Sequence, residues 1–464
     1  MNASAATKAD GALSASEKFA YGAGGLCDFF MANVLGALAV PVFTLGFGMD
    51  PFLLGVALAL PQIVATLADP LVGAVSDRCR SRRGRRKPFL ALGALAGAAV
   101  MPLVWWCPKD ASGAALFAWV AGLGALLAVC RSLFAVPYGA LGMELTPDYD
   151  ERTRVFAWKN LVGTAGTFAA AWFYWFCQRP LWGGEINGAR VLALIGAAVV
   201  AGAGLLLVAR CRERARLPPA PRRASPLRAA ASIARNRPFV MILGAQQLLA
   251  FGTGVVGVLG SYVHILFACR GDKDLAGQIA GLGGTLTVLS SLAAIPLGLW
   301  ISRRHGKRAA ALAGLGVLLC GLALLPFTLR PENPWLVVLT WTIDAVGMPC
   351  AAMIFGAMMP DICDEDELRT GLRREGAYAA VNSLVGRVTG VATLVASGLL
   401  PKLAGYADAS APPSAPVLER MRVMLIAVQI AVVVAAVLIV RLYPITRERA
   451  AETRRLVAAR RAET

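Results

Sequence analysis

Five ionisable residues lie inside long uncharged stretches of this sequence, and their types could do chemistry. They are Asp28, Asp69, Arg131, Asp344 and Arg387, with Lys159 close to the end of another such stretch. If these stretches cross a membrane, each charge costs at least ~2.5–3.5 kcal/mol on insertion scales. Deep carboxylates can bind a proton, a cation or hydroxyl groups, whereas a guanidinium can hold a carboxylate or a polyol. The residues therefore indicate binding and charge movement.

Each of these charges also has a purely structural interpretation. Asp28 lies about ten residues into the first stretch, ~15 Å deep at 1.5 Å per residue. There it can accept two hydroxyl hydrogen bonds and carry a proton, or it can pair with a nearby arginine to fix the helices. Arg131 and Arg387 can hold an acidic sugar such as a hexuronide, or they can form structural ion pairs with Asp28 and Asp344.

Aromatic and amide side chains add candidates for sugar contact. Aromatic rings offer flat apolar faces for a sugar ring, although packing in the core or at an interface is the alternative for each of them. Asn382 is a candidate because it lies one to two helical turns before Arg387. The full set of predicted substrate-binding residues is Asp28, Tyr138, Lys159, Trp341, Tyr378, Asn382 and Arg387.

Covalent and metal chemistry find no support in the residue pattern. The two histidines, His264 and His305, are far apart, and the ten cysteines include no pair with zinc-ligand spacing. We therefore expect no metal site, no cofactor and no enzymatic activity. A nucleotide-driven pump is also not expected, because the chain has no phosphate-binding GxxxxGK[ST] loop.

Long apolar runs account for most of the chain and predict membrane helices. Of the 464 residues, 57% are hydrophobic and 16% are charged, and the mean hydropathy is +0.62. A helix needs ~20 residues to cross ~30 Å of hydrocarbon, and continuous rather than alternating runs favour helices over barrel strands. The predicted spans are 18–47, 51–76, 88–106, 114–145, 156–177, 189–210, 237–267, 275–302, 308–328, 334–360, 376–402 and 419–443. We expect an all-α integral membrane protein with twelve transmembrane helices in two six-helix bundles.

The basic residues are concentrated in alternate connections between the spans. The formal net charge is +18, and segments 77–87, 210–237 and the tail hold most of the surplus, while the opposite loops are close to neutral. By the positive-inside rule both termini are expected in the cytoplasm and the chain in the inner (plasma) membrane. The surplus is then a topology signal, with membrane lipid rather than nucleic acid as the charged partner.

These boundaries give the expected division of the chain. A cytoplasmic segment 1–17 without a cleavable signal peptide precedes a bundle at 18–210, and a cytoplasmic Pro/Ala/Arg-rich linker 211–236 leads to a bundle at 237–443. The basic tail 444–464 is compatible with an interfacial helix or with disorder. The protein is expected to act as a monomer.

A glycine- and arginine-rich motif occurs twice, about half the chain apart, which points to a transporter built from internal repeats. The first copy reads GAVSDR at 73–78 and GRR at 84–86, and the second reads GLWISR at 298–303 and GKR at 306–308. A second repeat pairs a proline inside a span with acids at its end (VP at 136–137 with PDYDE at 147–151; MP at 348–349 with PDICDE at 360–365). Helix bends at matched positions suit bundles that rock. The predicted gating residues are Asp77, Arg78, Arg85, Arg86, Asp361 and Asp364, with Asp77 in a conformation-dependent salt bridge.

Three stretches make the chain resemble the glycoside–pentoside–hexuronide:cation symporter family, the melibiose-permease branch of the major facilitator superfamily. They are DPLVG at 69–73 running through DR at 77–78 to GRRKP at 84–88; VPYGAL at 136–141 with ERT at 151–153; and DICD at 361–364 with TG at 370–371 and RREG at 373–376. The resemblance implies the major facilitator fold and alternating access of two bundles. It also implies a sugar bound near the midplane and a co-transported Na⁺, Li⁺ or H⁺.

The resemblance also assigns roles to single residues, with two departures. Melibiose-type members draw their cation site from carboxylates of the second and fourth helices. Asp69 matches one of these, but Ala65 and Ala135 stand where two others are expected. Arg387 and Lys159 fall at basic positions of the eleventh and fifth helices, and Asp28 matches the sugar-binding acid of the first helix one residue out of register.

The predicted function is secondary active transport of a sugar or glycoside, with H⁺ favoured over Na⁺ as the coupling ion because Ala65 and Ala135 lack carboxylates. The predicted coupling residues are Asp69 and Asp28. The alternative is a protein of the same fold that exports or facilitates another amphipathic or lipid-like solute.

Overall fold

The structure is a computed structural model, and its elements are helices grouped into two compact units. It describes residues 13–81, 84–108, 111–146, 148–211, 213, 233–372, 374–406 and 413–463, among which no strand occurs. Unit 1 comprises Met1–Ala220 with Ala407–Pro412, and unit 2 comprises Pro221–Tyr406 with Pro413–Thr464. Nearly all of the predicted linker 211–236 lies outside the described residues.

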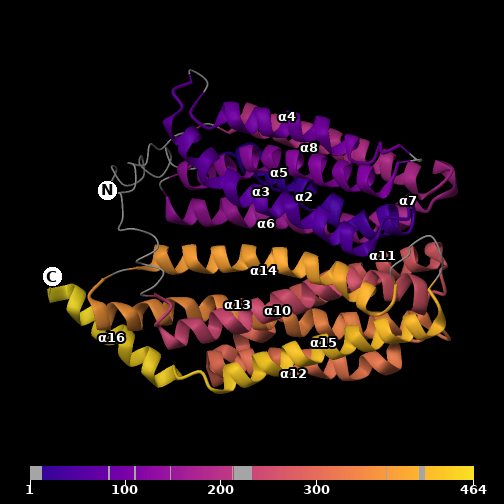
Figure 1. Ribbon diagram of the computed structural model, residues 1–464. Coiled ribbons are helices and arrows are strands. Elements are labelled where there is room, and N and C mark those ends of the chain that lie inside the picture. Colours follow the sequence, from indigo (N-terminus) through magenta and orange to yellow (C-terminus); the bar gives the residue numbers. More distant parts are fainter. Residues whose placement is uncertain are drawn as a thin grey trace. The chain divides into compact units, whose positions relative to one another are not determined.

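Among its described residues, unit 1 contains six long helices (Figure 1). They are α2 (Ala15–Ala39, extended by η1, Val40–Thr44), α3 (Pro51–Arg78), α4 (Lys87–Leu103), α5 (Gly113–Glu144), α6 (Tyr149–Ala171, followed by α7, Phe173–Cys177, and η2, Pro180–Trp182) and α8 (Glu185–Arg210).

The described part of unit 2 contains six further long helices and a seventh at its end. They are α10 (Arg237–Tyr262, extended by η3, Val263–Ala268), α11 (Lys273–His305), α12 (Lys307–Thr328), α13 (Val337–Thr370, preceded by η4, Pro334–Leu336), α14 (Glu375–Leu403), α15 (Ala415–Arg441) and α16 (Arg447–Glu463). Helix α16 covers residues 447–463 of the basic tail and packs against α13. This part of the tail is therefore helical.

The two units repeat the same helix pairings. In unit 1 the principal contacts are α2 with α6 and α8, α3 with α5, and α4 with α5 and α8. In unit 2 they are α10 with α14 and α15, α11 with α13, and α12 with α13 and α15. Numbered within each unit, both sets are 1–5, 1–6, 2–4, 3–4 and 3–6. The duplication read from the two basic motifs is therefore present in the packing.

Polar side chains at the helix starts explain where several of these helices begin. An oxygen of the residue before the first turn accepts a hydrogen bond from a backbone N–H that has no partner within the helix. Ser14, Asp50, Ser112, Asp148, Asn236 and Asp272 cap α2, α3, α5, α6, α10 and α11 in this way. Ser14 and Glu17 complete a reciprocal capping box.

Length and composition support a membrane-spanning bundle. Among the described residues ten helices are long and apolar enough to cross a membrane, and α4 is a shorter apolar helix. The predicted fifth span corresponds to α6 and α7, and the first turn of α6 carries charged residues. The predicted spans coincide with observed helices, but α13 continues past the predicted end at 360 to Thr370 because its last turns are tied down by ion pairs described below.

Candidate functional site

Polar side chains from three helices line a hollow of about 420 Å³ in unit 1. Its charged residues are Asp28 on α2, Arg131 on α5 and Lys159 on α6. The uncharged polar residues of the lining are Asn33, Asn160, Thr164 and Thr167. Carboxylate, guanidinium, ammonium, amide and hydroxyl groups thus share one wall of an otherwise apolar bundle. This is the set of donors and acceptors that can hydrogen-bond a polyol.

Asp28 and Arg131 form an ion pair on this wall. Arg131 Nε donates a hydrogen bond to Asp28 Oδ1 at 2.8 Å, and the two side chains are 24% and 38% exposed, with Arg131 the more exposed. The pair therefore lies open to the hollow rather than sealed in the bundle. A guanidinium has five donors and a carboxylate has about four acceptor sites, and this bond uses one of each. The structural pairing anticipated for Arg131 is present, and it leaves capacity for a ligand.

Lys159 brings an additional positive charge to the hollow. Among the described residues no carboxylate lies within ion-pairing distance of Lys159. Its Nζ lies 5.0 Å from the centroid of the Tyr138 ring, a cation–π contact that offsets part of the cost of placing the charge there. Asp28 is already matched by Arg131, so the hollow as a whole carries one positive charge in excess.

Tyr138 itself lies in the core, which corrects its predicted role in stacking on a sugar. The residue is 1% exposed, and its ring stacks on Tyr21 at 4.6 Å and on Phe134 at 5.5 Å between centroids. Its hydroxyl donates a 2.7 Å hydrogen bond to the Tyr21 carbonyl oxygen. The rings of Tyr21 and Phe134 and the ammonium group of Lys159 surround the Tyr138 ring, so Tyr138 supports Lys159 and the α2–α5 contact instead of offering a surface to a ligand.

Tyr378 in unit 2 is also a core residue, contrary to its predicted sugar contact. It is fully buried, and its hydroxyl accepts a 2.7 Å hydrogen bond from Asn236 Nδ2. Its ring packs edge-on against Phe239. Tyr378 therefore fastens α14 to the start of α10.

The other candidates in unit 2 lie on α13 and α14. Trp341 is half-buried on α13, next to Gly283 of α11 and with its ring 5.1 Å from that of His264. Asn382 and Arg387 are half-buried on α14, and Asn382 Oδ1 is a buried acceptor with no hydrogen-bond partner among the described residues. The three residues do not share a described cavity, so a sugar role for each stays a prediction.

Asp69 lies half-buried on α3, directly before Pro70. It is the only carboxylate of α3 above its last turn, and α5, the helix packed on α3, carries none before its final residue. Ala65 and Ala135 occupy these two helices at the positions where the family resemblance leads one to expect acids. Helices α3 and α5 therefore offer one carboxylate within the apolar part of their contact. A sodium site commonly draws on several oxygen ligands.

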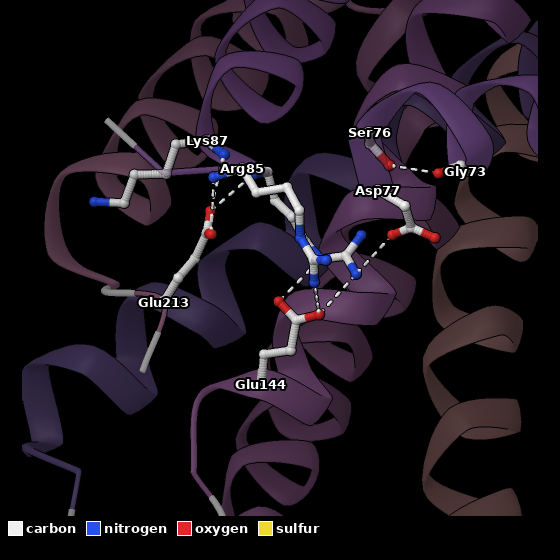
Figure 2. A network of polar contacts seen from close by, with 8 residues as sticks. Gly73, Ser76, Asp77, Arg85, Lys87, Glu144 and Glu213 are labelled. Atoms are coloured by element: carbon white, nitrogen blue, oxygen red, sulfur yellow. Dashed lines mark hydrogen bonds and ion pairs between the residues drawn. The ribbon is translucent and has the colours of Figure 1, made fainter. Parts of the chain in front are cut away.

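A dense ion-pair network joins α3, α4 and α5 at the end of unit 1 where α3 connects to α4 (Figure 2). Glu144, the last residue of α5, is almost fully buried and binds Arg85 Nη2 at 2.6 Å and Arg86 Nη2 at 2.7 Å. Arg86 also pairs with Asp77 at 3.1 Å. Burial by itself lowers the pKa of Arg86, but the bond to Glu144 and the charges of both acids raise it above its ordinary value.

Glu213 caps the start of α4 from beyond the end of α8 (Figure 2). Its carboxylate accepts hydrogen bonds from the backbone N–H groups of Arg85, Arg86 and Lys87 at 2.9, 2.8 and 3.3 Å. These are the donors that a helix start leaves unpaired. Gly84 has φ +111°, and a Cβ there would come within 2.7 Å of Glu213 Oε1. Because Gly84 has no Cβ, the Glu213 carboxylate can approach closely enough to cap α4.

Unit 2 has a related network where α11 connects to α12. Lys307, at the start of α12, binds Asp361 Oδ2 at 2.5 Å and the Ala357 carbonyl oxygen at 2.6 Å. Further along α13, Arg374 binds Asp366 at 2.6 Å, and Arg449 of α16 binds Glu365. The bond to Asp366 raises the pKa of Arg374 above its ordinary value.

In both units, then, a basic residue at the start of the third helix forms an ion pair with an acid near the end of the fourth. The pairs are Arg86 with Glu144 in unit 1 and Lys307 with Asp361 in unit 2. The network of unit 1 contains Asp77, Arg85 and Arg86, whereas Arg78 is exposed. In unit 2 it contains Asp361, while Asp364 lies half-buried on the same helix. Gating by these residues stays a prediction. Glu144, Glu213 and Asp366 were not among the residues predicted from the sequence, and Glu365 was noted only as part of the acidic repeat at 360–365. Each is an acid near or just beyond a helix end that faces a basic connection, and this pattern could have identified them.

Among the described residues no group of three or more histidines, cysteines or acids is placed to hold a metal ion.

Comparison with known proteins places these features in context. The model of the MFS/sugar transport protein family matches residues 20–447. The putative glycoside/cation symporter YagG of Escherichia coli (strain K12) is 24% identical over 97% of this chain and 96% of its own. The isoprimeverose transporter of Lactiplantibacillus pentosus is 22% identical over 84% and 81%, and the sphingosine-1-phosphate transporter MFSD2B of Mus musculus is 25% identical over 91% and 87%.

Solved structures confirm the predicted fold class. A bacterial homologue of the human lysosomal transporter Spinster, in an inward-facing and unoccupied conformation, matches with a TM-score of 0.68 at 14% identity. The match covers 92% of this chain and 98% of that one. The all-α major facilitator architecture is therefore the architecture of this chain.

Proposed function

The chain belongs to the MFS/sugar transport protein family, among the glycoside–pentoside–hexuronide:cation symporters, and we propose that it moves a sugar or glycoside across a membrane together with a proton. It is a multi-pass membrane protein, and the family and its structural neighbours are transporters. The cation, the chemical type of the sugar and the orientation in the membrane are parts of the proposal.

The observation that carries the proposal is the polar hollow of unit 1. Asp28, Arg131 and Lys159 converge there with two asparagines and two threonines. Thr164 and Thr167 donate their hydroxyl hydrogens to carbonyl oxygens one turn earlier in α6, which leaves their oxygens as acceptors. Such a wall can exchange hydrogen bonds with several sugar hydroxyls at once.

The charge of this wall favours a sugar with an acidic substituent. Asp28 and Arg131 offset each other, and within the described part of the chain Lys159 contacts the Tyr138 ring and forms no ion pair. A carboxylate on the substrate would place its negative charge near the ammonium group in a setting of reduced dielectric constant, where such attraction is strong. We therefore propose a hexuronide-type substrate over a neutral glycoside.

A proton is favoured over Na⁺ as the coupling ion. Sodium has to be surrounded by several oxygen ligands, whereas a proton needs a single carboxylate. Asp69 is the single carboxylate within the apolar part of the α3–α5 contact, and alanines occupy the other two expected positions. Asp69 and Asp28 are the family-derived candidates for this role.

Both termini and the connection between the units are proposed to be cytoplasmic, in the inner (plasma) membrane, because the basic connections alternate with near-neutral ones along the chain. Single cysteines at positions 183 and 410, in a cysteine-free background, should react with a membrane-impermeant reagent in sealed cells. A cysteine at 220 should not, and its labelling would reverse the orientation.

The function is tested by uptake into proteoliposomes containing the purified protein. Radiolabelled methyl glucuronide and methyl glucoside are compared under an inward proton gradient in sodium-free buffer. Saturable accumulation of either sugar, collapsed by a protonophore, supports sugar–proton symport. If the protein neither binds nor transports these two sugars or any other glycoside of a wider panel, the proposal of a sugar substrate is wrong.

A second candidate is transport of an amphipathic, lipid-like anion. It is favoured by Ala65 and Ala135, which lack the carboxylates of sugar symporters, and by the similarity to a transporter of sphingosine-1-phosphate. An anionic head group would also suit Lys159. The same proteoliposomes loaded with labelled sphingosine-1-phosphate separate the two candidates, because release of this lipid without sugar uptake would favour the second.

A further inference from the structure

Helices α12 and α13 of unit 2 pack backbone to backbone along a glycine-lined seam. A Cβ at Gly314 of α12 would lie 2.9 Å from the Ala351 nitrogen and 3.0 Å from the Gly347 oxygen of α13. A Cβ at Gly347 would lie 2.7 Å from the Gly314 oxygen. Only glycine permits this approach, so the seam is closely packed over these turns.

Asp344 lies in the same seam, one helical turn before Gly347. A Cβ at Gly321 of α12 would overlap Asp344 Oδ1, so the carboxyl group occupies the space that this glycine leaves empty. Asp344 Oδ1 is buried and has no hydrogen-bond partner among the described residues. The residue as a whole is half-buried, so the group sits at the margin of the seam.

The corresponding seam of unit 1 shows that the fold itself does not require an acid here. In unit 1, Gly93 of α4 lies against the Cys130 oxygen and the Phe134 nitrogen of α5, as Gly314 lies against Gly347 and Ala351. This match places Leu127 at the position of Asp344 and Val100 at that of Gly321. Both are buried apolar residues. Unit 2 thus replaces an apolar pair with a carboxyl group and a glycine that makes room for it.

Several helices that pack against α13 carry charged or titratable residues. On α12, Lys307 and Arg308 belong to the first turn, and Lys307 is already bound to Asp361. Cys320, next to Gly321, is exposed. The charged and titratable residues whose side chains are described on the remaining helices that contact α13 are Arg237 and Tyr262 on α10, His264 in its η3 extension, Lys273, Asp274, Arg303, Arg304 and His305 at the two ends of α11, Glu375, Tyr378, Arg387 and Lys402 on α14, and Arg447, Glu448, Arg449, Glu452, Arg454, Arg455 and Arg460 on α16.

None of these residues forms a hydrogen bond or an ion pair with Asp344 Oδ1. His264 is buried near Trp341 and contacts the Ala276 carbonyl oxygen. Arg387 takes part in an interaction elsewhere than at Asp344 Oδ1. An ionised carboxylate without a compensating partner is costly in such a setting, and the group avoids the cost by holding a proton. Asp28 of unit 1 differs from Asp344 because Arg131 pairs with its carboxylate.

We propose that Asp344 is a proton-binding site of unit 2: its buried carboxyl group holds a proton, releases it to water during the transport cycle, and takes it up again. Only the O–H bond is broken and re-formed, so no other reactant is needed. The inference rests on the proposed proton-coupled transport for its purpose, but the protonation itself does not depend on the substrate.

Infrared spectroscopy of the purified protein in liposomes tests the protonation directly. A protonated carboxyl group in an apolar site absorbs as a C=O stretch that is separate from the carboxylate bands. We expect such a band at neutral pH in the wild-type protein, its loss as the pH rises, and its absence in Asp344→Asn. The matched control is Asp274→Asn at the exposed start of α11, which should leave the band unchanged. A wild-type spectrum that Asp344→Asn leaves unaltered overturns the proposal.

Gly321→Ala provides a second variant that leaves the acid in place. The added methyl group would displace the carboxyl group and should shift the band or the pH at which it is lost. Gly316→Ala, on the same helix, is the control because a Cβ there meets nothing within 4 Å. Equal responses of the two glycine variants would contradict the assigned position of the proton.

A transport measurement distinguishes failure of the Asp344 proposal from failure of the proposed sugar–proton symport. With labelled methyl glucuronide as the probe, Asp344→Asn should lower gradient-driven accumulation at least about tenfold while exchange of internal for external sugar stays within about twofold. Unchanged accumulation by this variant overturns the role of Asp344. If the wild-type protein accumulates no glycoside, the symport proposal fails instead, and the infrared titration alone decides whether Asp344 binds the proton.

Discussion

Arg131 of α5 and Asp28 of α2 are joined by a 2.8 Å hydrogen bond on the open wall of a hollow, with both side chains partly exposed. An ion pair placed there differs from one buried for stability, because a ligand can reach both partners. The pair can be reorganised by a sugar hydroxyl or carboxylate, which couples binding to the contact between two helices.

Breaking this pair should affect transport more than folding. Asp28→Asn and Arg131→Gln should each lower uptake at least about tenfold, which is about 1.4 kcal/mol of lost transition-state stabilisation. The cost in stability should be about 1–3 kcal/mol, less than for a fully sealed pair, because water reaches both groups. Initial uptake rates and thermal unfolding of the purified variants measure the two effects.

The double variant Asp28→Asn with Arg131→Gln distinguishes binding from structure. We expect it to recover the thermal stability lost by the single variants without recovering uptake. Recovery of full uptake would mean that the pair serves only to hold α2 against α5.

Lys159 should decide the preference for an acidic sugar. Lys159→Gln removes the unmatched charge of the hollow and should weaken uptake of methyl glucuronide at least about tenfold, about 1.4 kcal/mol, while methyl glucoside changes little. Competition between the two sugars at equal concentration gives the ratio directly. An equal loss for both sugars would assign Lys159 to the packing against Tyr138 instead.

Most of the helices could be predicted from the sequence because they are long apolar runs, and six of them begin at a polar cap. The spans at 51–76, 114–145 and 237–267 coincide with α3, α5 and α10 with η3 to within a few residues. The wall of the hollow was anticipated in part, since Asp28 and Arg131 were recognised as charges within apolar stretches and Lys159 as a charge close to the end of one.

Burial of the aromatic residues could not be predicted in the same way. Tyr138 and Tyr378 lie on helices that carry predicted site residues, but a helix places neighbouring side chains on different faces. Whether a given face meets a ligand or another helix depends on the packing partner. Here the partners are Tyr21 for Tyr138, and Asn236 with Phe239 for Tyr378, both distant in sequence. Glu144 and Glu213 were missed because their partners lie 58 and 127 residues from them along the chain.

Glu144 should stabilise unit 1 because it is the buried partner of two arginines. Glu144→Gln leaves Arg85 and Arg86 without a full counter-charge and should lower the free energy of unfolding by about 3 kcal/mol. The exposed Glu332→Gln is the matched control and should change it by less than about 0.5 kcal/mol. Thermal unfolding in detergent, with hydrogen exchange at the start of α4, measures the difference. A melting curve for Glu144→Gln equal to that of the control would show that this network does not stabilise unit 1.

Arg387 should act in binding or coupling rather than in folding. Arg387→Gln should leave expression and thermal stability nearly intact while lowering active uptake at least about tenfold, about 1.4 kcal/mol or more. A structural role predicts the opposite pattern, with a loss of about 3–5 kcal/mol of stability from a stranded buried acid. A well-expressed variant with normal gradient-driven uptake would contradict the assignment.

The ion dependence of uptake distinguishes symport of a sugar with a proton from symport with sodium. Labelled methyl glucuronide is offered to proteoliposomes at fixed membrane potential, with either an inward proton gradient in sodium-free buffer or an inward sodium gradient at equal pH on both sides. Proton symport predicts accumulation with the proton gradient, accompanied by alkalinisation of the external medium, and no stimulation by sodium. Accumulation driven by sodium alone, without movement of protons, would contradict it.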